Sequence, residues 1–321
     1  MISRVAENCF WLFRYLERAE NMARLVHVNR GFQLETSQGW HPVLVVSGED
    51  GRYPAEDAED GESVQEYLTW DRDSPVGIVA SLFWARENAR MIRELISLEM
   101  WESINAAWQW LQGASGRKLY RSDRDAFYRK VKDSVALVIG ISQNTLLRGE
   151  PLDFMRLGMM LERAGQTARI MDVKYHLIGP TSASGAETAV EVAHWIALLR
   201  SCSAADSFSR QHQAGLHSSD VIRFLLKEER FPRSVYYCLT CSATYLGRIE
   251  ESTGSRATRS GHLLRDLVED LRTESTKEVL ESGLHAELTR IIDTTAEVCE
   301  AIHSDFFNPT LPEKVFQEHP A

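Results

Sequence analysis

Two triplets of an acid, an amide and an arginine recur in the chain with the same spacing of i, i+4 and i+7. They are Glu17, Asn21 and Arg24, and Glu162, Gln166 and Arg169. Residues three and four apart are neighbours on a helix, so each triplet predicts one polar stripe. A glutamate in such a stripe could transfer protons, and an arginine could bind a carboxylate or phosphate through two parallel hydrogen bonds. Glu17 and Glu162 are therefore the candidate catalytic residues.

One arginine directly follows each of these glutamates, Arg18 in the first triplet and Arg163 in the second. Each lies about 100° around the helix from its glutamate, and Arg18 is beside the apolar face made by Leu16, Ala19 and Ala23. An arginine at such a position is partly buried and needs a partner for its charge. The simpler interpretation is that symmetric Glu–Arg ion pairs cross-link helices in a bundle. The alternatives are a polar cleft that binds an anionic or peptide-like ligand, and exposed stripes without a role.

Further arginines are weaker candidates for anion binding. Arg86, Arg90 and Arg93 share one predicted helix face, with Asn88 beside them. Neighbouring glutamates can pair with these arginines locally, so a structural or solvated face is the favoured interpretation. Arg233 stands at a predicted helix start, where backbone N–H groups and the helix dipole attract anions.

Two Glu-x-x-His pairs match half of the ligand set of a carboxylate-bridged di-metal bundle. They are Glu191 with His194 and Glu300 with His303, and Glu17 and Glu162 could supply the remaining carboxylates. Two such pairs are close to the number that chance gives, and the one Cys-x-x-Cys lacks the second pair that a zinc site needs. The sequence contains no glycine-rich phosphate loop, nucleophile elbow or His-Glu-x-x-His run. We predict no metal and no cofactor, with the di-metal bundle as a minor alternative.

Helical periodicity accounts for most of the chain, so the predicted fold class is all-α. A first helix runs from Ser3 to about residue 29, with apolar residues at three- and four-residue steps. Ser74-Pro75 predicts the start of a helix that continues to residue 112, with a restart near Ser97. Later helices are predicted at about 122–147, 152–177, 187–212, 219–227, 232–254, 262–281 and 284–304.

Two segments fall outside this helical pattern. Residues 31–73 contain many acids together with glycines and prolines, which predicts a solvated surface excursion. Within it, residues 41–46 form the one strand-like run, too short and isolated to support a sheet. Residues 306–321, with three prolines, are predicted to be a C-terminal tail.

Composition excludes several classes of function. The 321 residues include 36 basic and 46 acidic ones, for a net charge of −10. This acidic balance argues against nonspecific binding to nucleic acid or to anionic membranes, which need a basic surface.

The uncharged stretch 134–147 is too short to cross a bilayer, which takes about 20 apolar residues. The charged first turns are unlike a secretory signal. The five cysteines have no framework spacing, so we expect a cytoplasmic protein.

The two triplets belong to a longer internal repeat. Residues 16–28 and 161–173 are identical at seven of thirteen positions, and a weaker match pairs 64–78 with 221–235 in the same order. Colinear matches favour the duplication of a helical unit, with halves of about 1–148 and 149–305. We therefore predict a single large helical bundle over residues 1–305, in which two pseudo-symmetric halves meet along their polar stripes.

Several short motifs, in the same order, resemble the bacterial alpha-E family, a helical domain named for its Glu–Arg motif. The matching stretches are residues 1–7, 15–21, 85–90, 99–102, 156–164 and 232–235. Candidate ligand-binding residues are those of the two triplets together with Arg4, Arg18, Arg86, Asn88, Arg90, Arg163 and Arg233. Gly77 departs from the family pattern, which usually has a serine at this position.

The resemblance implies a role in peptide chemistry. Alpha-E domains are typically encoded beside, or fused to, circularly permuted ATP-grasp amide ligases and transglutaminase-like peptidases, which are the partners it suggests. Our first hypothesis is a non-catalytic accessory or scaffold protein that binds such an enzyme, or a peptide or amino-acid ligand, through a Glu/Arg-lined cleft. The alternative is an enzyme, a transferase or hydrolase acting on a peptide amide, with Glu17 or Glu162 as the general base.

Overall fold

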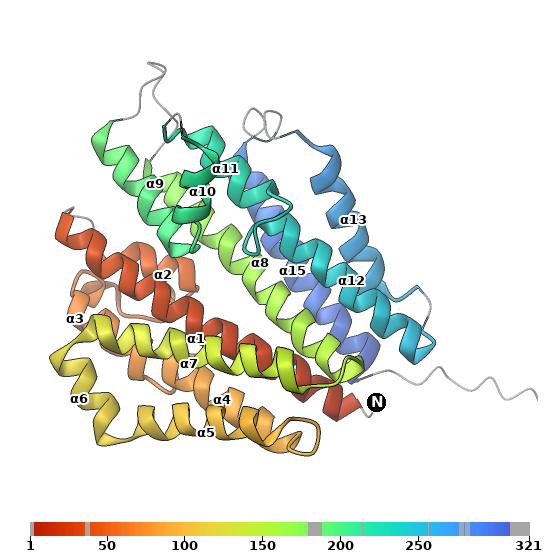
Figure 1. Cartoon of the computed structure of the whole chain (residues 1–321). Helices are drawn as coiled ribbons and strands as arrows, with labels where there is room; N and C mark the ends of the chain where they lie inside the picture. Colours follow the sequence, from red (N-terminus) through yellow and green to blue (C-terminus); the bar gives the residue numbers. More distant parts are fainter. Residues whose placement is uncertain are drawn as a thin grey trace, which may run out of the picture.

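The computed structural model of the chain describes residues 3–35, 39–178, 188–213, 215–255, 257–275, 279 and 283–308. These residues form helices joined by turns and contain no strand, which confirms the all-α fold class (Figure 1). The helices of the first part are α1 (Ser3–Glu35), α2 (His41–Ser47), η1 (Ala55–Asp57), α3 (Gly61–Trp70), α4 (Ile78–Met91), α5 (Leu98–Gln112), α6 (Ala114–Ser122) and α7 (Arg124–Thr145). Those of the second part are α8 (Glu150–Ile178), α9 (Ala189–Ser201), α10 (Ala205–Gln211), α11 (Ser218–Lys227), α12 (Val235–Thr253), α13 (Arg259–Thr273), α15 (Leu284–Ile302) and the π-helical turn η2 (His303–Phe307).

Two long helices, α1 and α8, pack against each other and organise the bundle. Helix α1 also contacts α4 and α7, and α5 packs on both of these. In the same way, α8 contacts α12 and α15, and α13 packs on both of these. Figure 1 shows the first group in red to yellow and the second in green to blue. The two groups therefore follow the same order along the chain, whereas their origin by duplication stays a hypothesis.

The backbones of α1 and α8 approach closely because Gly158 lacks a side chain. A Cβ atom at Gly158 would lie 2.2 Å from the carbonyl oxygen of Phe10. Any other residue would push the two helices apart. Ala19 on α1 and Ala164 on α8 are fully buried as well.

The bundle continues beyond residue 305, where the sequence predicted the start of a tail. The turn η2 buries Phe306 and Phe307. The Phe307 ring centroid lies 5.5 Å from that of Phe10 on α1 and 5.9 Å from that of Phe154 on α8. These contacts between aromatic rings fix the last described turn on both long helices. Residues 309–321 of the predicted tail lie outside the described residues.

The prediction of a solvated excursion over 31–73 is wrong for much of its length. Its strand-like run is the helix α2, whose Val43 and Leu44 are buried and which packs on α1 and α8. The valines favour a strand only weakly, and burial of an apolar helix face overrides that preference. Helix α3 likewise buries Leu68, and exposed acids are found around η1.

Helix starts differ in how well the sequence predicts them. Ser97 caps α5 by accepting a hydrogen bond from the Met100 N–H at 3.2 Å, which confirms the predicted restart. Ser74 does not cap α4, which begins at Ile78 with Gly77 as its N-cap. The Gly77 N–H donates to the Ser74 carbonyl, so residues 74–77 form a turn ahead of the helix.

One long predicted helix proves to be two. The pattern over 187–212 splits into α9 and α10, and Ser203 lies between them with a positive φ of 52°. Non-glycine residues adopt this left-handed conformation rarely, so periodicity alone gave no signal for the break.

Candidate functional site

Two reciprocal Glu–Arg pairs join α1 and α8. Arg18 on α1 donates from Nε and Nη2 to the two carboxylate oxygens of Glu162 on α8, at 2.7 and 3.0 Å. Arg163 on α8 donates to both oxygens of Glu17 on α1 in the same way, at 2.8 and 2.7 Å. Both pairs are bidentate, which makes them strong and geometrically specific.

The third nitrogen of each arginine binds the backbone ahead of another helix. Arg18 Nη1 donates to the Pro75 carbonyl before α4 at 3.4 Å, and Arg163 Nη1 donates to the Pro232 carbonyl before α12 at 3.2 Å. Each pair therefore connects three helices, namely α1, α8 and α4 in one case and α8, α1 and α12 in the other. This is the cross-linking arrangement that the simpler sequence interpretation describes.

A second arginine on each glutamate breaks the symmetry between the halves. Arg14 on α1 donates to Glu162 Oε2 at 3.0 Å. Arg233, in the turn before α12, donates to Glu17 Oε1 at 3.0 Å. The equivalent positions of the opposite half carry a methionine and a valine. Each carboxylate therefore holds two guanidiniums, but the second one comes from a different part of the fold.

Both carboxylates are closed off from solvent. The Glu17 side chain is 0% exposed and the Glu162 side chain 3%. Burial opposes the ionisation of Glu17, but the Arg163 and Arg233 guanidiniums outweigh it and lower its pKa to about 2. Burial opposes the ionisation of Glu162 as well, yet its two arginines hold its pKa well below the usual value. A general base at neutral pH needs a raised pKa, so this geometry argues against proton transfer by either glutamate.

Around Glu17 the network extends along α1. Arg233 also donates to Glu20 at 2.9 Å and to Asn21 at 2.8 Å, and Arg24 pairs with Glu20. Burial and the nearby charge of Arg233 lower the pKa of Arg24 to about 9. The structure thus brings the whole first triplet and the distant Arg233 into one buried cluster.

The second triplet is less complete. Gly165 occupies the position equivalent to Glu20, so Arg169 lacks the carboxylate that Arg24 has. Neither Gln166 nor Arg169 forms a hydrogen bond or ion pair with another described residue. Gln166 is 9% exposed, and burial lowers the pKa of Arg169. Within the described part of the chain, the second triplet therefore keeps an amide and a guanidinium without a hydrogen-bonding partner.

The remaining candidate residues lie apart from these pairs. Arg86 and Arg90 both donate to Glu87 on their own helix, α4. Asn88 donates back to a carbonyl of α4, and Arg4 is exposed at the start of α1. Among the described residues, none of these side chains hydrogen-bonds to the α1–α8 pairs. Arg86 and Arg90 instead pair locally with Glu87, as the favoured interpretation of the sequence predicts.

Several residues of the di-metal alternative are engaged elsewhere. Glu17 and Glu162 hold arginines, and Glu191 accepts a hydrogen bond from the Thr188 N–H at the start of α9. His303 lies 3.9 Å from a carboxylate oxygen on α1. Within the described ranges, no group of three or more His, Cys, Asp or Glu side chains could hold a metal ion.

Sequence reasoning missed Arg14 and Glu20. Their spacing offered a signal, because Arg14 precedes Arg18 by one helical turn and Glu20 precedes Arg24 by four residues. No pattern in the sequence indicates the two proline carbonyls that accept hydrogen bonds from the arginines, because every residue has a backbone carbonyl.

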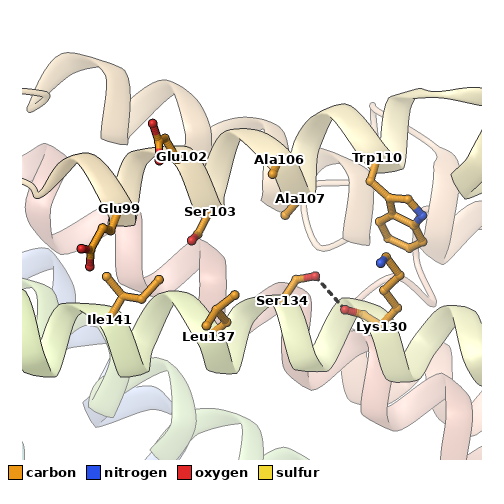
Figure 2. A pocket seen from close by; sticks show the side chains of 10 residues that line it. All are labelled: Glu99, Glu102, Ser103, Ala106, Ala107, Trp110, Lys130, Ser134, Leu137 and Ile141. Carbon is orange, nitrogen blue, oxygen red and sulfur yellow. Dashed lines mark hydrogen bonds between the residues drawn. The ribbon is translucent and has the colours of Figure 1, made fainter.

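A groove between α5 and α7 is a second candidate surface (Figure 2). Its volume is about 560 Å³, and Leu137 and Ile141 line it from α7. Glu99 lies at one end, and Trp110 with Lys130 lies at the other, as Figure 2 shows. None of its lining residues belongs to the Glu–Arg network.

The fold and its centre define a class of helical domain in which two long helices are joined by reciprocal Glu–Arg pairs. The chain belongs to the Alpha-E family, described as a predicted alpha-helical domain with a conserved ER motif, whose model matches residues 1–307. The Glu-Arg dipeptides at 17–18 and 162–163 fit that description.

Relatives of the chain are uncharacterized proteins. One from Mycobacterium bovis and one from Mycobacterium tuberculosis are each 25% identical to it over 315 residues, covering 90% of this chain and 35% of the relative. The chain thus spans about a third of the length of the curated relatives it matches. No solved structure matches it. None of the described helices is long and apolar enough to cross a membrane.

Proposed function

We propose that this protein is a non-catalytic, cytoplasmic accessory or scaffold protein of an ATP-grasp amide-ligase system that makes or attaches a peptide. The observation that carries the non-catalytic role is the enclosure of Glu17 and Glu162, each of which is buried and bound to two guanidiniums. The rival role, a transferase or hydrolase acting on a peptide amide, needs one of these carboxylates open to substrate and able to take a proton at neutral pH.

The partner in this proposal is a circularly permuted ATP-grasp ligase, with a transglutaminase-like peptidase as the second one. Both follow from the family resemblance. The length of the relatives supports a role beside other domains, because the matched region is only 35% of each relative. For a peptide or amino-acid ligand, the residues of the hypothesised Glu/Arg-lined cleft that stay available are Gln166 and Arg169, whose polar groups have no hydrogen bond to another described residue.

The surface that best suits the ligase is the groove between α5 and α7. Large exposed apolar side chains also lie on α4, α5, α7 and the turn between α4 and α5. They are Trp84, Met91, Leu95, Leu98 and Leu137, with 43–58% of each side chain exposed. Exposed apolar side chains beside a groove favour a protein interface when they are contiguous. Two glutamates at one end of the groove favour a partner surface with apolar side chains flanked by lysine or arginine.

Co-purification with the ligase tests this proposal. We expect the wild-type protein to retain a circularly permuted ATP-grasp ligase from the same genome, and Leu137→Glu to weaken the complex at least tenfold. A charge placed in an apolar contact is desolvated without a partner, which makes such a loss reasonable. The matched control is Leu147→Glu, because Leu147 is 92% exposed and does not line the groove.

Two results would count against the proposal. If no ligase is retained by the wild-type protein, the accessory role is wrong. If Leu137→Glu and Leu147→Glu both bind like the wild type, the partner docks elsewhere and the groove is excluded. Hydrolysis or transfer of a peptide amide by the purified protein, lost in Glu17→Gln, would establish the rival role.

A further inference from the structure

Three buried polar side chains near Phe32 have no hydrogen bond to another described residue. Lys174 on α8 is 5% exposed, and its ammonium lies 4.8 Å from the centroid of the Phe32 ring. His194 on α9 is 9% exposed, and its ring centroid lies 4.8 Å from that of the same phenyl ring. Asn29, one turn before Phe32 on α1, is 5% exposed.

These groups are unsatisfied in the described part of the chain. His194 Nδ1 and Asn29 Nδ2 are buried without a hydrogen-bond partner, and the Lys174 ammonium has neither a hydrogen bond nor an ion pair. A buried polar group left unpaired costs about 1–3 kcal/mol, and a charged one costs more. Three of them at one place point to an acceptor that a ligand supplies.

A pocket leads to this cluster. Lys174 and Asn29 line a narrow slit between α1, α2, α8 and α9, with a free volume of about 10 Å³, which is room for about one oxygen atom or water. An outer pocket of about 420 Å³ between α1 and α9 shares Val28, Phe32 and Ala197 with the slit. The slit and the pocket therefore adjoin, with the narrow part at Lys174.

The charges around this cavity all have one sign. Lys174 lines the slit and Arg200 lines the outer pocket. His27 also lines the outer pocket, but burial lowers its pKa, so it is mainly neutral at pH 7. No Asp or Glu is among the described residues that line either part. Burial lowers the pKa of Lys174 to about 8, so its amine is still mainly protonated at pH 7. Most of the other lining side chains are apolar.

We propose that this cavity binds the carboxylate end of an apolar molecule, with one carboxylate oxygen in the slit lined by Lys174 and Asn29. The apolar part of the molecule then occupies the outer pocket, where Val192 and Ile196 contribute apolar surface. A carboxylate neutralises the ammonium and accepts from the neighbouring donors, whereas an uncharged amide leaves the buried charge uncompensated. This site is additional to the accessory role and does not depend on it.

Two natural sources share this chemistry, a free carboxylic acid and the C-terminus of an apolar peptide. Calorimetry at pH 7 with the full chain distinguishes them, using octanoate and acetyl-alanyl-leucine as probes. The control ligands are octanamide and the C-terminal amide of the same dipeptide. We expect at least one carboxylate probe to bind the wild-type protein at least tenfold tighter than its amide. The carboxylate that binds more tightly identifies the source.

Substitution of Lys174 assigns the preference to this site. In Lys174→Met the carboxylate should lose at least tenfold in affinity while the amide changes less than twofold, because the apolar stem is kept and only the charge is removed. Lys118→Met, on the exposed surface of α6, should bind like the wild type. If Lys174→Met does not fold, Asn29→Leu serves instead, and it should weaken the carboxylate about fivefold, the effect of one hydrogen bond.

The inference is overturned if the wild-type protein binds neither carboxylate probe, or binds carboxylate and amide equally. It is also overturned if Lys174→Met, or Asn29→Leu in its place, keeps the full preference for the carboxylate. Loss of ligase binding in Leu137→Glu leaves these results unaffected, so the two proposals fail or succeed separately.

Discussion

Arginine suits the centre of this protein better than lysine would, for a reason of geometry. Its planar fork binds both oxygens of one carboxylate and still offers a nitrogen to a backbone carbonyl. Arg18 and Arg163 use all of these donors, each bridging a glutamate on the opposite long helix and a proline carbonyl ahead of a third helix. The pairs thus hold helices that lie far apart in sequence.

Removal of one carboxylate should therefore be costly. Glu17→Ala leaves Arg163 buried without a counter-charge and removes one of the two carboxylates that pair with Arg233. We therefore expect the free energy of unfolding to fall by about 3–5 kcal/mol. Glu87→Ala is the matched control, because Glu87 pairs with Arg86 and Arg90 nearer the surface, where such pairs are worth about 1 kcal/mol or less. Urea unfolding of the two variants measures the difference, and equal losses would mean that the central pair is not a structural clamp.

The same pair predicts how stability depends on pH. The pKa of Glu17 in the folded protein is about 2, below its ordinary value of 4.5. The ionised carboxylate therefore contributes its full stabilisation when the pH is above the ordinary pKa of 4.5. This contribution is lost as the pH falls toward the folded-state pKa of about 2. We expect the urea midpoint to fall less steeply between about pH 5 and pH 3 in Glu17→Gln than in the wild type. Identical slopes would show that Glu17 does not carry this dependence.

At the scale of helices, the close approach of α1 and α8 depends on one glycine. Gly158→Ala places a Cβ atom 2.2 Å from the Phe10 carbonyl oxygen, so the helices must separate, and we expect a loss of about 1–3 kcal/mol. The control is Gly140→Ala in α7, where an added Cβ meets no atom within 4 Å. There alanine should stabilise the helix by up to about 1 kcal/mol.

Thermal unfolding of both glycine variants provides the measurement. A lower midpoint for Gly158→Ala together with an unchanged or higher one for Gly140→Ala supports the close contact. A shift of the same sign and size in both would show that helix propensity alone explains the result, and that α1 and α8 are not limited by contact at Gly158.

The whole molecule is one bundle because contacts between its halves run through its centre. The Glu–Arg pairs and the packing of α1 on α8 join the two groups of helices, and Phe307 contacts both long helices. The halves are similar but not equivalent. Glu20 pairs with Arg24 in the first half, whereas Gly165 leaves Arg169 without that partner in the second. Function is therefore expected to differ between the two stripes.

The amino-acid sequence determined most of the helices, the Glu-Arg motif and its repetition. The 3.6-residue periodicity and the Glu-Arg spacing are local properties, because neighbouring positions on one helix are set by the helix itself. For this reason the sequence correctly predicted the helix start at Ser97 and the Glu–Arg pairing of Arg18. The family resemblance followed from the same short stretches.

Tertiary structure alone decided the rest. Which arginine pairs with which glutamate depends on how α1 crosses α8. Residues 41–46 form a helix because they pack on an apolar surface contributed by α1 and α8. The cluster of Lys174, His194 and Asn29 comes from three different helices with no shared spacing. Burial and long-range contact free energies set these features, and no local pattern in the sequence encodes them.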